Sequence, residues 1–390
     1  MKPNKILIFV IASICSLTAC GQLFQPLGLD LGLGHRMGPN SVPQMHIENN
    51  KLFVCTNQGL YSKDLSNLNS VWYLEGFEGV PMQDYVRNGN DILALRYGVN
   101  GEFFLLSHDG GKTYQDVTPS LFVESGGAEN ELIKLVQHPN ERNTLLVASS
   151  LMGILESSDF GQTWMPLTDI ILGNGIGYNP SNPDIIYNCG WDDAFSPHLN
   201  ISYDGGHTWE YLPLSFPGDN CVHQLSFNPS NPNHWIACGD GVVYISTDNG
   251  HTWETQNFWN DGKRNFRWYF ATFDSDNSEN VYLVGSLGEL VIMCSTDGGK
   301  TWSIPKTETI HYANSCNVND VQQYGDNLFV YTEADVYKIS KSELLAKSSV
   351  QSVTAATIGT PSVYFDLLGR RASTSTRGIV VSRGRKYLIR

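Results

Sequence analysis

The sequence predicts an all-β fold: a seven-bladed β-propeller of four-stranded blades, followed by a small C-terminal β tail. Three observations support this. A Ser-x-Asp-x-Gly-x-Thr-aromatic pattern occurs five times, and its aspartates are 44 to 50 residues apart, close to the length of a propeller blade. Strand-like apolar runs and polar turns alternate around each copy. The 390 residues are rich in glycine and aromatic side chains and show no long helical periodicity.

The repeated pattern is typical of a hairpin turn between the third and fourth strands of a blade. Glycine supplies backbone angles that other residues resist, and an aspartate can accept several N–H bonds across the turn. The hydroxyls cap the flanking strands, and the aromatic ring packs between neighbouring sheets. We therefore predict a structural role for the five aspartates. They are Asp109, Asp159, Asp204, Asp248 and Asp297.

Two weaker copies of the turn bring the count to seven. One contains Asp64 and precedes the intact copies, and the other is Val336–Ser340, which follows them. Turn-forming Asn-Pro or Pro-Asn pairs near His138, Asn179 and Asn228 mark where a first strand hands over to a second. The predicted blades are 43–77, 80–119, 130–168, 172–214, 221–257, 266–306 and 311–355.

The first 19 residues read as a signal peptide, because two lysines precede an apolar stretch too short to span a bilayer. Leu17-Thr-Ala-Cys20 then resembles a bacterial lipobox, which implies acylation of Cys20. An ordinary secretory signal that ends near a cysteine is the alternative. Residues 20–42 are expected to form a tether. The resemblance implies a lipid-anchored protein of the outer membrane or cell surface, with the periplasmic face as an alternative.

Charge and cysteine spacing exclude several kinds of partner. The formal net charge is −14, and it becomes −16 when the signal with Lys2 and Lys5 is removed. An acidic surface argues against nucleic acid, and membrane contact is expected only through the lipid. No cofactor or metal is expected, since no cysteines have CxxC spacing and each aspartate turn carries a single carboxylate. The six later cysteines read as core thiols with their pairing left open: Cys55, Cys189, Cys221, Cys238, Cys294 and Cys316.

The C-terminal stretch, residues 356–390, is basic and has alternating apolar residues. Its segments Asp366-Leu-Leu-Gly-Arg and Gly378-Ile-Val resemble the tail of exported Bacteroidetes proteins, which is an export signal in type IX secretion substrates. A lipobox is not the usual companion of that tail, so extra strands packed on the last blade are the alternative. The predicted segments are the signal (1–19), tether (20–42), propeller (43–355) and tail (356–390).

The repeated turn resembles the Asp box of BNR-repeat propellers over roughly residues 43–345. This group includes sialidases, family 74 glycoside hydrolases (xyloglucanases), sortilin-type receptors and photosystem II assembly propellers. Leu145–Trp164 is most similar to the family 74 enzymes, although their cleft lies between two propellers and this chain has one. The Arg-Ile-Pro signature of sialidases is absent. In these families the boxes lie on the face away from the ligand, so the resemblance implies that the five aspartates are not catalytic.

The resemblance directs the search for a site to the loops between second and third strands. The longest such loop carries Trp191, Asp192 and Asp193. An aromatic ring can stack on a sugar and two carboxylates can serve as acid and base, so Asp192 and Asp193 are the candidate catalytic residues. A solvated loop with its aromatic rings folded onto the sheet is the alternative. The candidate ligand-binding residues are Trp191, His198, Arg267, Trp268, Tyr269 and Glu289.

The resemblance implies a cell-surface, carbohydrate-related lipoprotein. It would be either a glycan-binding propeller or a diverged glycoside hydrolase, with a polysaccharide or glycan as its ligand. Whether it is an enzyme stays open; an enzyme would be xyloglucanase-like more than sialidase-like. The alternative is a non-enzymatic assembly or receptor-type propeller that binds a protein partner.

Overall fold

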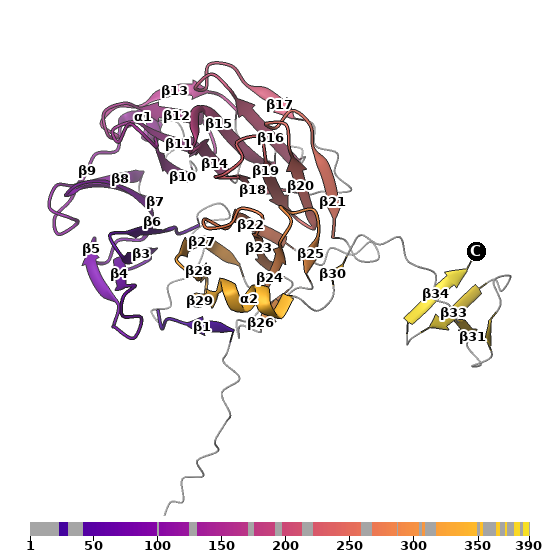
Figure 1. Cartoon of the computed structure of the whole chain (residues 1–390). Coiled ribbons are helices and arrows are strands. Elements are labelled where there is room, and N and C mark those ends of the chain that lie inside the picture. Colours follow the sequence, from indigo (N-terminus) through magenta and orange to yellow (C-terminus); the bar gives the residue numbers. More distant parts are fainter. Residues whose placement is uncertain are drawn as a thin grey trace, which may run out of the picture.

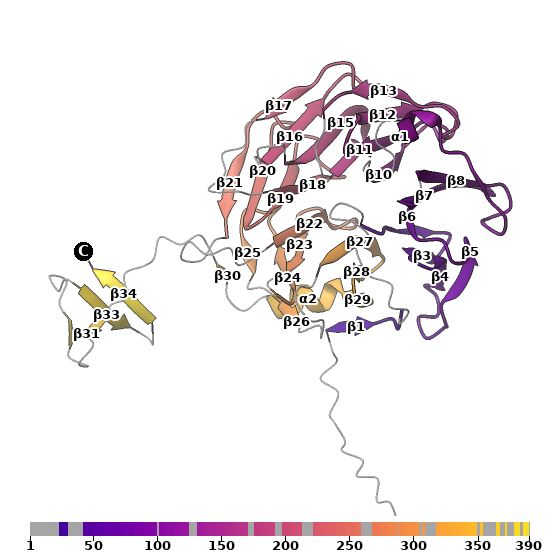
Figure 2. The same ribbon diagram turned by 180° about the vertical axis from the view of Figure 1, so that it is seen from behind.

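Seven four-stranded antiparallel sheets are arranged as blades around a common axis (Figure 1), which confirms the predicted propeller. The computed structural model describes residues 23–29, 42–99, 101–124, 131–170, 175–191, 197–212, 221–258, 267–286, 288–303, 306–308, 317–348, 352–353, 364–366, 371–372, 378–382 and 385–389. The first six blades follow the chain, and in each the first strand lies nearest the axis. Figure 2 shows the same ring from behind.

The strand bounds of these six blades are as follows. Blade 1 contains β2 (Met45–Glu48), β3 (Lys51–Thr56), β4 (Gly59–Asp64) and β5 (Tyr73–Gly76). Blade 2 contains β6 (Met82–Asn88), β7 (Asp91–Val99), β8 (Glu102–Ser107) and β9 (Gln115–Asp116). Blade 3 contains β10 (Leu132–Gln137), β11 (Leu145–Ser149), β12 (Gly153–Ser157) and β13 (Met165–Thr168). Blade 4 contains β14 (Gly175–Asn179), β15 (Asn182–Trp191), β16 (Pro197–Ser202) and β17 (Glu210–Leu212). Blade 5 contains β18 (Val222–Phe227), β19 (Trp235–Gly239), β20 (Val242–Ser246) and β21 (Glu254–Asn257). Blade 6 contains β22 (Arg267–Phe273), β23 (Val281–Ser286), β24 (Leu290–Ser295) and β26 (Lys306–Glu308).

Blade 7 is completed by the N-terminal segment. Its three consecutive strands are β27 (Val318–Tyr324), β28 (Asn327–Thr332) and β29 (Val336–Ser340), and β1 (Phe24–Pro26) supplies the outer fourth strand. Phe24 lies opposite Ile339 in this antiparallel pair. Part of the segment expected to be a tether is therefore a propeller strand that closes the ring.

The chain turns into a helix where blade 7 would otherwise have formed its own fourth strand. Helix α2 (Lys341–Ser348) starts directly after β29. The Ser340 hydroxyl accepts a hydrogen bond from the Glu343 backbone N–H at 3.1 Å, which is the geometry of a helix N-cap. This cap explains why the weaker copy of the turn at Val336–Ser340 leads into a helix.

Hydrogen bonds between first strands hold adjacent blades together. The Asp320 carboxylate accepts the Met45 N–H at 2.9 Å, which joins blade 7 to blade 1. Gln224 accepts the Ala271 N–H in the same way at 3.0 Å, joining blade 5 to blade 6. In both strands a β-bulge precedes the accepting residue. A bulge re-aims the side chains near it, and here it directs them to the neighbouring backbone.

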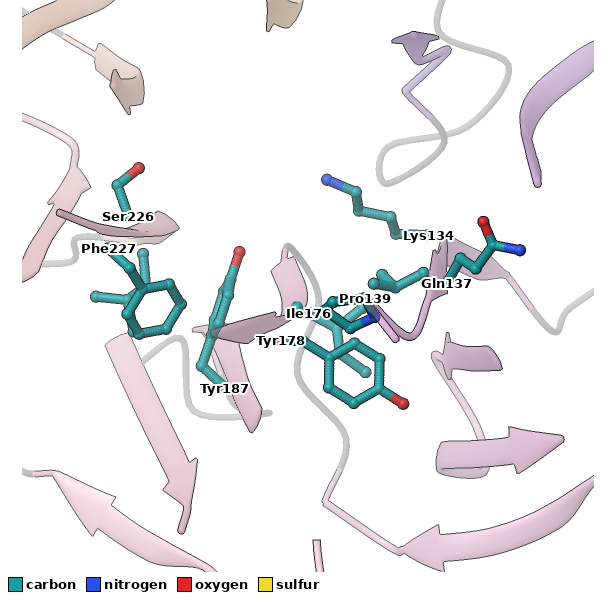
Figure 3. Close-up of a pocket in the computed structure, with 11 residues that line it drawn as sticks. Lys134, Gln137, Pro139, Ile176, Tyr178, Tyr187, Ser226 and Phe227 are labelled. Atoms are coloured by element: carbon teal, nitrogen blue, oxygen red, sulfur yellow. The ribbon is translucent and has the colours of Figure 1, made fainter. Parts of the chain in front are cut away.

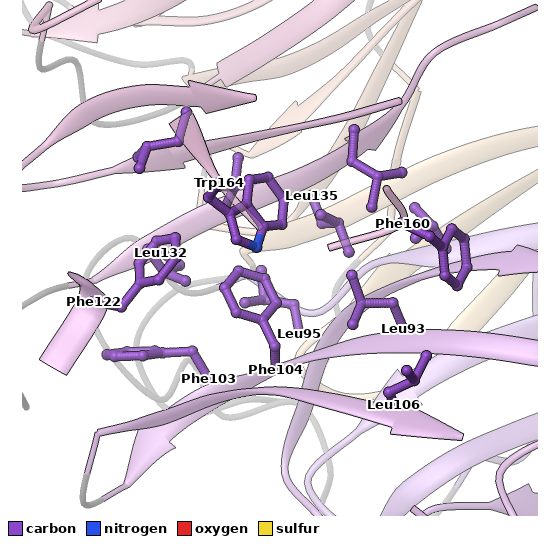
Figure 4. Packing of buried hydrophobic residues seen from close by; sticks show 14 residues of the cluster. Leu93, Leu95, Phe103, Phe104, Leu106, Phe122, Leu132, Leu135, Phe160 and Trp164 are labelled. Carbon is purple, nitrogen blue, oxygen red and sulfur yellow. The ribbon is translucent and has the colours of Figure 1, made fainter. Parts of the chain in front are cut away.

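Aromatic side chains fill the spaces between blades. Between blades 2 and 3, the rings of Phe104 and Trp164 stack with centroids 5.1 Å apart (Figure 4). Phe122, from the short helix α1 (Ser120–Glu124), meets Trp164 edge-on. Trp164 is the aromatic residue of an aspartate turn, so its burial agrees with the role predicted for it.

All five intact aspartate turns have the same local geometry. In each, the serine hydroxyl donates to the aspartate at 2.7–2.9 Å. The backbone N–H of the threonine donates to the same carboxylate at 2.8–2.9 Å. In blade 5, Asn249 (φ 62°) and Gly250 (φ 84°) both adopt left-handed conformations. A Cβ at Gly250 would lie 2.3 Å from the Trp235 ring, so glycine is needed there for packing as well.

The aspartate turns predict a loss of stability in acid. Hydrogen bonds from the threonine of each turn lower the pKa values of Asp109, Asp204 and Asp248 from 3.8 to about 2. The unfolded chain therefore takes up these protons at higher pH than the folded chain does. Their contribution to stability is complete above the unfolded pKa and is lost as the pH falls through about 2. We expect the midpoint temperature of thermal unfolding to fall as the pH is lowered from about 4 to about 2, and to fall less in Asp248→Asn than in the wild type. An equal fall in both proteins would contradict the stabilising role of the Asp248 carboxylate.

Two further small sheets include residues from the end of the chain. β25 (Trp302–Ser303) pairs with β30 (Ser352–Val353). The C-terminal strands form a sheet that shares no strand with a blade: β31 (Tyr364–Asp366), β32 (Arg371–Ala372), β33 (Gly378–Ser382) and β34 (Arg385–Ile389). Within the described part of the chain, no helix is long and apolar enough to cross a membrane. The expected signal peptide and Cys20 lie outside the described residues.

Candidate functional site

Each blade has two ends, and the aspartate turns occupy one of them. In blade 5, Ser246 at the start of the turn pairs with Trp235, whereas Val242 pairs with Gly239 at the other end of the same strands. Strands of this length separate the two ends by about 15 Å, at about 3.3 Å per residue. We call the end with the aspartate turns the turn face. The loop face is the end with the loops between second and third strands, such as Gly239–Val242.

Five polar side chains form a continuous chain on the loop face of blades 5 to 7. Asp240 Oδ1 lies 3.0 Å from His223 Nε2, and the ring centroids of His223 and Tyr269 are 5.0 Å apart. The Tyr269 hydroxyl donates to Asn317 Oδ1 at 3.0 Å. Asn317 Nδ2 donates to Glu333 Oε1 at 2.6 Å. We call these five residues the polar chain. It joins three adjacent blades through groups that also suit a ligand rich in hydroxyls.

Bulges and glycines place the inner members of the polar chain. His223 and Tyr269 occupy the bulges in β18 and β22, so each is the extra residue of its strand. Opposite these bulges the second strands carry Gly239 and Gly285. A Cβ at Gly239 would lie 2.0 Å from the backbone oxygen of Cys221, which directly precedes β18. A Cβ at Gly285 would lie 1.9 Å from the backbone oxygen of Arg267. The close approach of the strands therefore requires glycine at both positions.

The polar chain is mostly buried and is flanked by an exposed cation. The side chains of His223 and Asp240 are 17% and 14% exposed, and Tyr269 is buried. Arg267, at the start of β22, is exposed. Burial alone would lower the pKa of Arg267, but Tyr269 and the charge of Asp240 outweigh this effect and raise it. Arg267 is thus a permanent positive charge at the edge of an otherwise uncharged or acidic cluster.

The structure brings three predicted ligand-binding residues to the loop face of blade 6. Arg267 pairs with Ser286, and Ser286 pairs with Leu290 across the turn that contains Glu289. Tyr269 lies two residues further along the same first strand. Arg267, Tyr269 and Glu289 therefore lie at the same end of blade 6, as candidates for one site.

Trp268 does not lie at a surface. Its ring is fully buried, and it packs edge-on to Phe258 with centroids 5.7 Å apart. Successive side chains in a strand point to opposite faces of the sheet, and Trp268, between the candidates Arg267 and Tyr269, points into the core. The expectation that its ring contacts a ligand is corrected: Trp268 is a packing residue.

The blade 4 candidates are placed only in part. His198 lies in β16, with its ring 4.7 Å from that of the exposed Tyr211. Trp191 is the last residue of β15. Asp192 and Asp193 lie outside the described residues, so the catalytic pair stays a prediction.

Sequence reasoning missed four members of the polar chain, namely His223, Asp240, Asn317 and Glu333. Gly239-Asp240-Gly241 is a short loop in the sequence, and no motif distinguishes it from the other short loops. His223 and Asn317 are polar residues at the start of first strands. Their meeting with Asp240 and Glu333 depends on how adjacent blades pack, which local sequence does not encode.

No metal centre appears among the residues that the structure describes, where no group of three or more His, Cys, Asp or Glu could hold an ion. The five described later cysteines are buried, as expected of core thiols. They are Cys55, Cys189, Cys221, Cys238 and Cys294; Cys316 is not among the described residues.

Comparison with known proteins gives three sequence matches of note. A family model described as "Sortilin, neurotensin receptor 3" matches residues 197–358. An oligoxyloglucan-reducing end-specific xyloglucanase of Emericella nidulans is 26% identical over 204 residues, which cover 46% of this chain and 24% of the relative. A xyloglucanase of Acetivibrio thermocellus is 25% identical over 218 residues, which cover 45% and 26%. The chain spans about a quarter of the length of these relatives.

Solved structures share the fold at low identity. The GH74 xyloglucanase of Xanthomonas campestris superposes with a TM-score of 0.58 at 15% identity, covering 80% of this chain and 53% of that one. YCF48 from Cyanidioschyzon merolae gives a TM-score of 0.55 at 13% identity, covering 79% of this chain and 98% of that one. Together the matches show a β-propeller that resembles family 74 and sortilin-type propellers.

Proposed function

We propose that this protein is a glycan-binding propeller whose ligand lies on the loop face of blades 5 to 7. The polar chain is the observation that carries the proposal. Sugar recognition needs donors and acceptors held in fixed positions, and the chain holds two carboxylates, an imidazole, a phenol and an amide by mutual contacts. The similarity to xyloglucanases supports a polysaccharide as the ligand.

Arg267 and Glu289 extend the same surface. An exposed guanidinium offers several donors in a fixed fork, which suits a sugar carboxylate or a pair of hydroxyls. A more specific version of the proposal is that the protein also hydrolyses the bound glycan. Hydrolysis would need an acid and a base near the bound glycan, with Asp192 and Asp193 of the adjacent blade as the candidates.

Attachment through Cys20 belongs to the same proposal. β1 starts at Phe24, four residues after Cys20, and this distance is about 14 Å at most along an extended chain. Phe24 lies opposite Ile339, next to Ser340 at the turn-face end of β29. A lipid on Cys20 would therefore hold the membrane near the turn face and leave the loop face open to a glycan.

Calorimetry tests the proposal by measuring whether the protein binds xyloglucan or any of a panel of other plant and microbial polysaccharides. We expect Arg267→Ala to weaken binding of the preferred glycan by about tenfold or more, because a charged hydrogen bond to the ligand is lost. Lys112→Ala is the matched control, since it removes an exposed cation from the turn face and should bind like the wild type.

Reducing ends measured in the same samples separate binding from hydrolysis. Failure of the wild-type protein to bind any polysaccharide would contradict the proposal and favour a protein partner. Equal losses in Arg267→Ala and Lys112→Ala would contradict the placement of the site.

A further inference from the structure

A hollow lies near the axis, at the end of the blades opposite the polar chain. It has a volume of about 290 Å³ and is formed where the first strands of blades 3, 4 and 5 run toward the turn face (Figure 3). Its wall includes the side chains of Ile176, Tyr178, Tyr187 and Phe227. The polar chain belongs to the loop face, so the two sites do not share residues.

Glycine in the first strand of blade 4 shapes this hollow. A Cβ at Gly177 would lie 2.6 Å from the Tyr187 ring, so the ring lies directly across the strand at that point. Tyr187 is 6% exposed and forms an aromatic wall with Phe227, at a centroid distance of 5.8 Å. The result is an apolar, aromatic surface beside the axis.

Lys134 supplies a cation at the edge of this surface. It lies in β10, and its side chain makes no ion pair or hydrogen bond with any residue in the described part of the chain. In Figure 3 the Lys134 amine and the hydroxyls of Tyr187 and Ser226 lie on the same side of the hollow, away from the Tyr178 ring. A half-buried ammonium without a partner, next to an aromatic wall, favours an anionic ligand with an apolar body.

Lys134 also interacts electrostatically with Asp320 of blade 7. Burial raises the pKa of Asp320 in blade 7, and the positive charge of Lys134 opposes that shift. Asp320 already accepts backbone hydrogen bonds from Met45 at 2.9 Å and from Val321 at 2.7 Å. Asp320 thus has backbone hydrogen-bond partners of its own, and it forms no ion pair with Lys134 among the described residues.

We propose that this hollow binds a small carboxylate with an apolar ring or chain. The carboxylate pairs with Lys134, and the apolar part lies against Tyr187, Ile176 and Phe227. The volume is near the lower end of the range for small-molecule pockets, so the ligand is about the size of one ring with a short side arm. This inference does not depend on the glycan proposal.

Calorimetric titration with phenylacetate, and with phenylacetamide as its uncharged analogue, tests the inference on the full-length chain. We expect the wild type to bind phenylacetate about tenfold or more tightly than phenylacetamide, because only the acid can pair with Lys134. Lys134→Met should lose that preference for phenylacetate. Lys134→Arg, which keeps the positive charge, should retain it. Lys112→Met on the turn face should behave as the wild type.

Comparison of the two ligands on the wild type needs no variant, so the test stands even where Lys134→Met fails to fold. Equal binding of the acid and the amide, or no binding of phenylacetate at about 10 mM, would overturn the inference. Retention of the full preference in a folded Lys134→Met protein would overturn it as well.

Discussion

Replacing Phe24 by alanine is expected to lower the free energy of unfolding by about 3–5 kcal/mol. Phe24 is 1% exposed and belongs to a core cluster with Tyr282, Leu328 and Ile339 of blades 6 and 7. Removal of the ring leaves a cavity and loosens β1, the strand that completes blade 7. Unfolding in urea, followed by tryptophan fluorescence, measures the change.

Gln25→Ala is the matched control for Phe24→Ala. Gln25 lies in the same strand, and its side chain is exposed. Its pairing with Lys338 is through the backbone, so the substitution should change stability by no more than about 0.5 kcal/mol. Equal stability of Phe24→Ala and the wild type would show that β1 does not hold the ring closed.

Asp274→Ala is the second substitution with a large expected effect, again about 3–5 kcal/mol of destabilisation. Asp274 and Lys341 form a buried ion pair at 2.9 Å, with side chains 6% and 3% exposed. The Tyr282 hydroxyl also donates to Asp274, at 2.8 Å. The pair ties helix α2 to blade 6, and loss of the carboxylate leaves the buried ammonium with only the exposed Asp276, 3.5 Å away, as its ion-pair partner among the described residues.

Two further variants distinguish a buried charge from a general loss of packing. Asp276→Ala removes a carboxylate that is 77% exposed and 3.5 Å from the same lysine, and it should cost less than about 1 kcal/mol. The double variant Asp274→Leu with Lys341→Met should recover much of the lost stability, because it removes both buried charges. If Asp274→Ala proves no worse than Asp276→Ala, the pair is not a tie between α2 and blade 6.

Local pattern was enough to predict the blades. The turn repeat is fixed by hydrogen bonds within eight residues, so five copies could be counted and placed from sequence alone. The two weaker copies of the turn were harder to interpret. Val336–Ser340 does end a third strand, but the serine then caps a helix. The outer strand of that blade comes from the other end of the chain, and nothing in Phe24–Pro26 indicates the pairing.

The candidate site on the loop face was predictable only where the positions of its residues follow from the order of the strands within a blade. Arg267, Tyr269 and Glu289 could be named as candidates because they lie in or next to the loop face of one blade. Trp268 was assigned wrongly to a ligand surface because the sequence does not show which residue of a bulged strand faces the core. The meeting of His223 with Asp240 and of Asn317 with Glu333 depends on tertiary packing.

Hydrogen–deuterium exchange in the presence of the preferred glycan tests the central claim most directly. The account predicts slower exchange in the loop-face peptides that contain Asp240, Glu289 and Glu333, because those loops border the polar chain. It predicts no change in the aspartate turns around Asp159, Asp204 and Asp248. Protection confined to the turns, or to the loop face of blades 1 to 3, would contradict the claim that the glycan binds over blades 5 to 7.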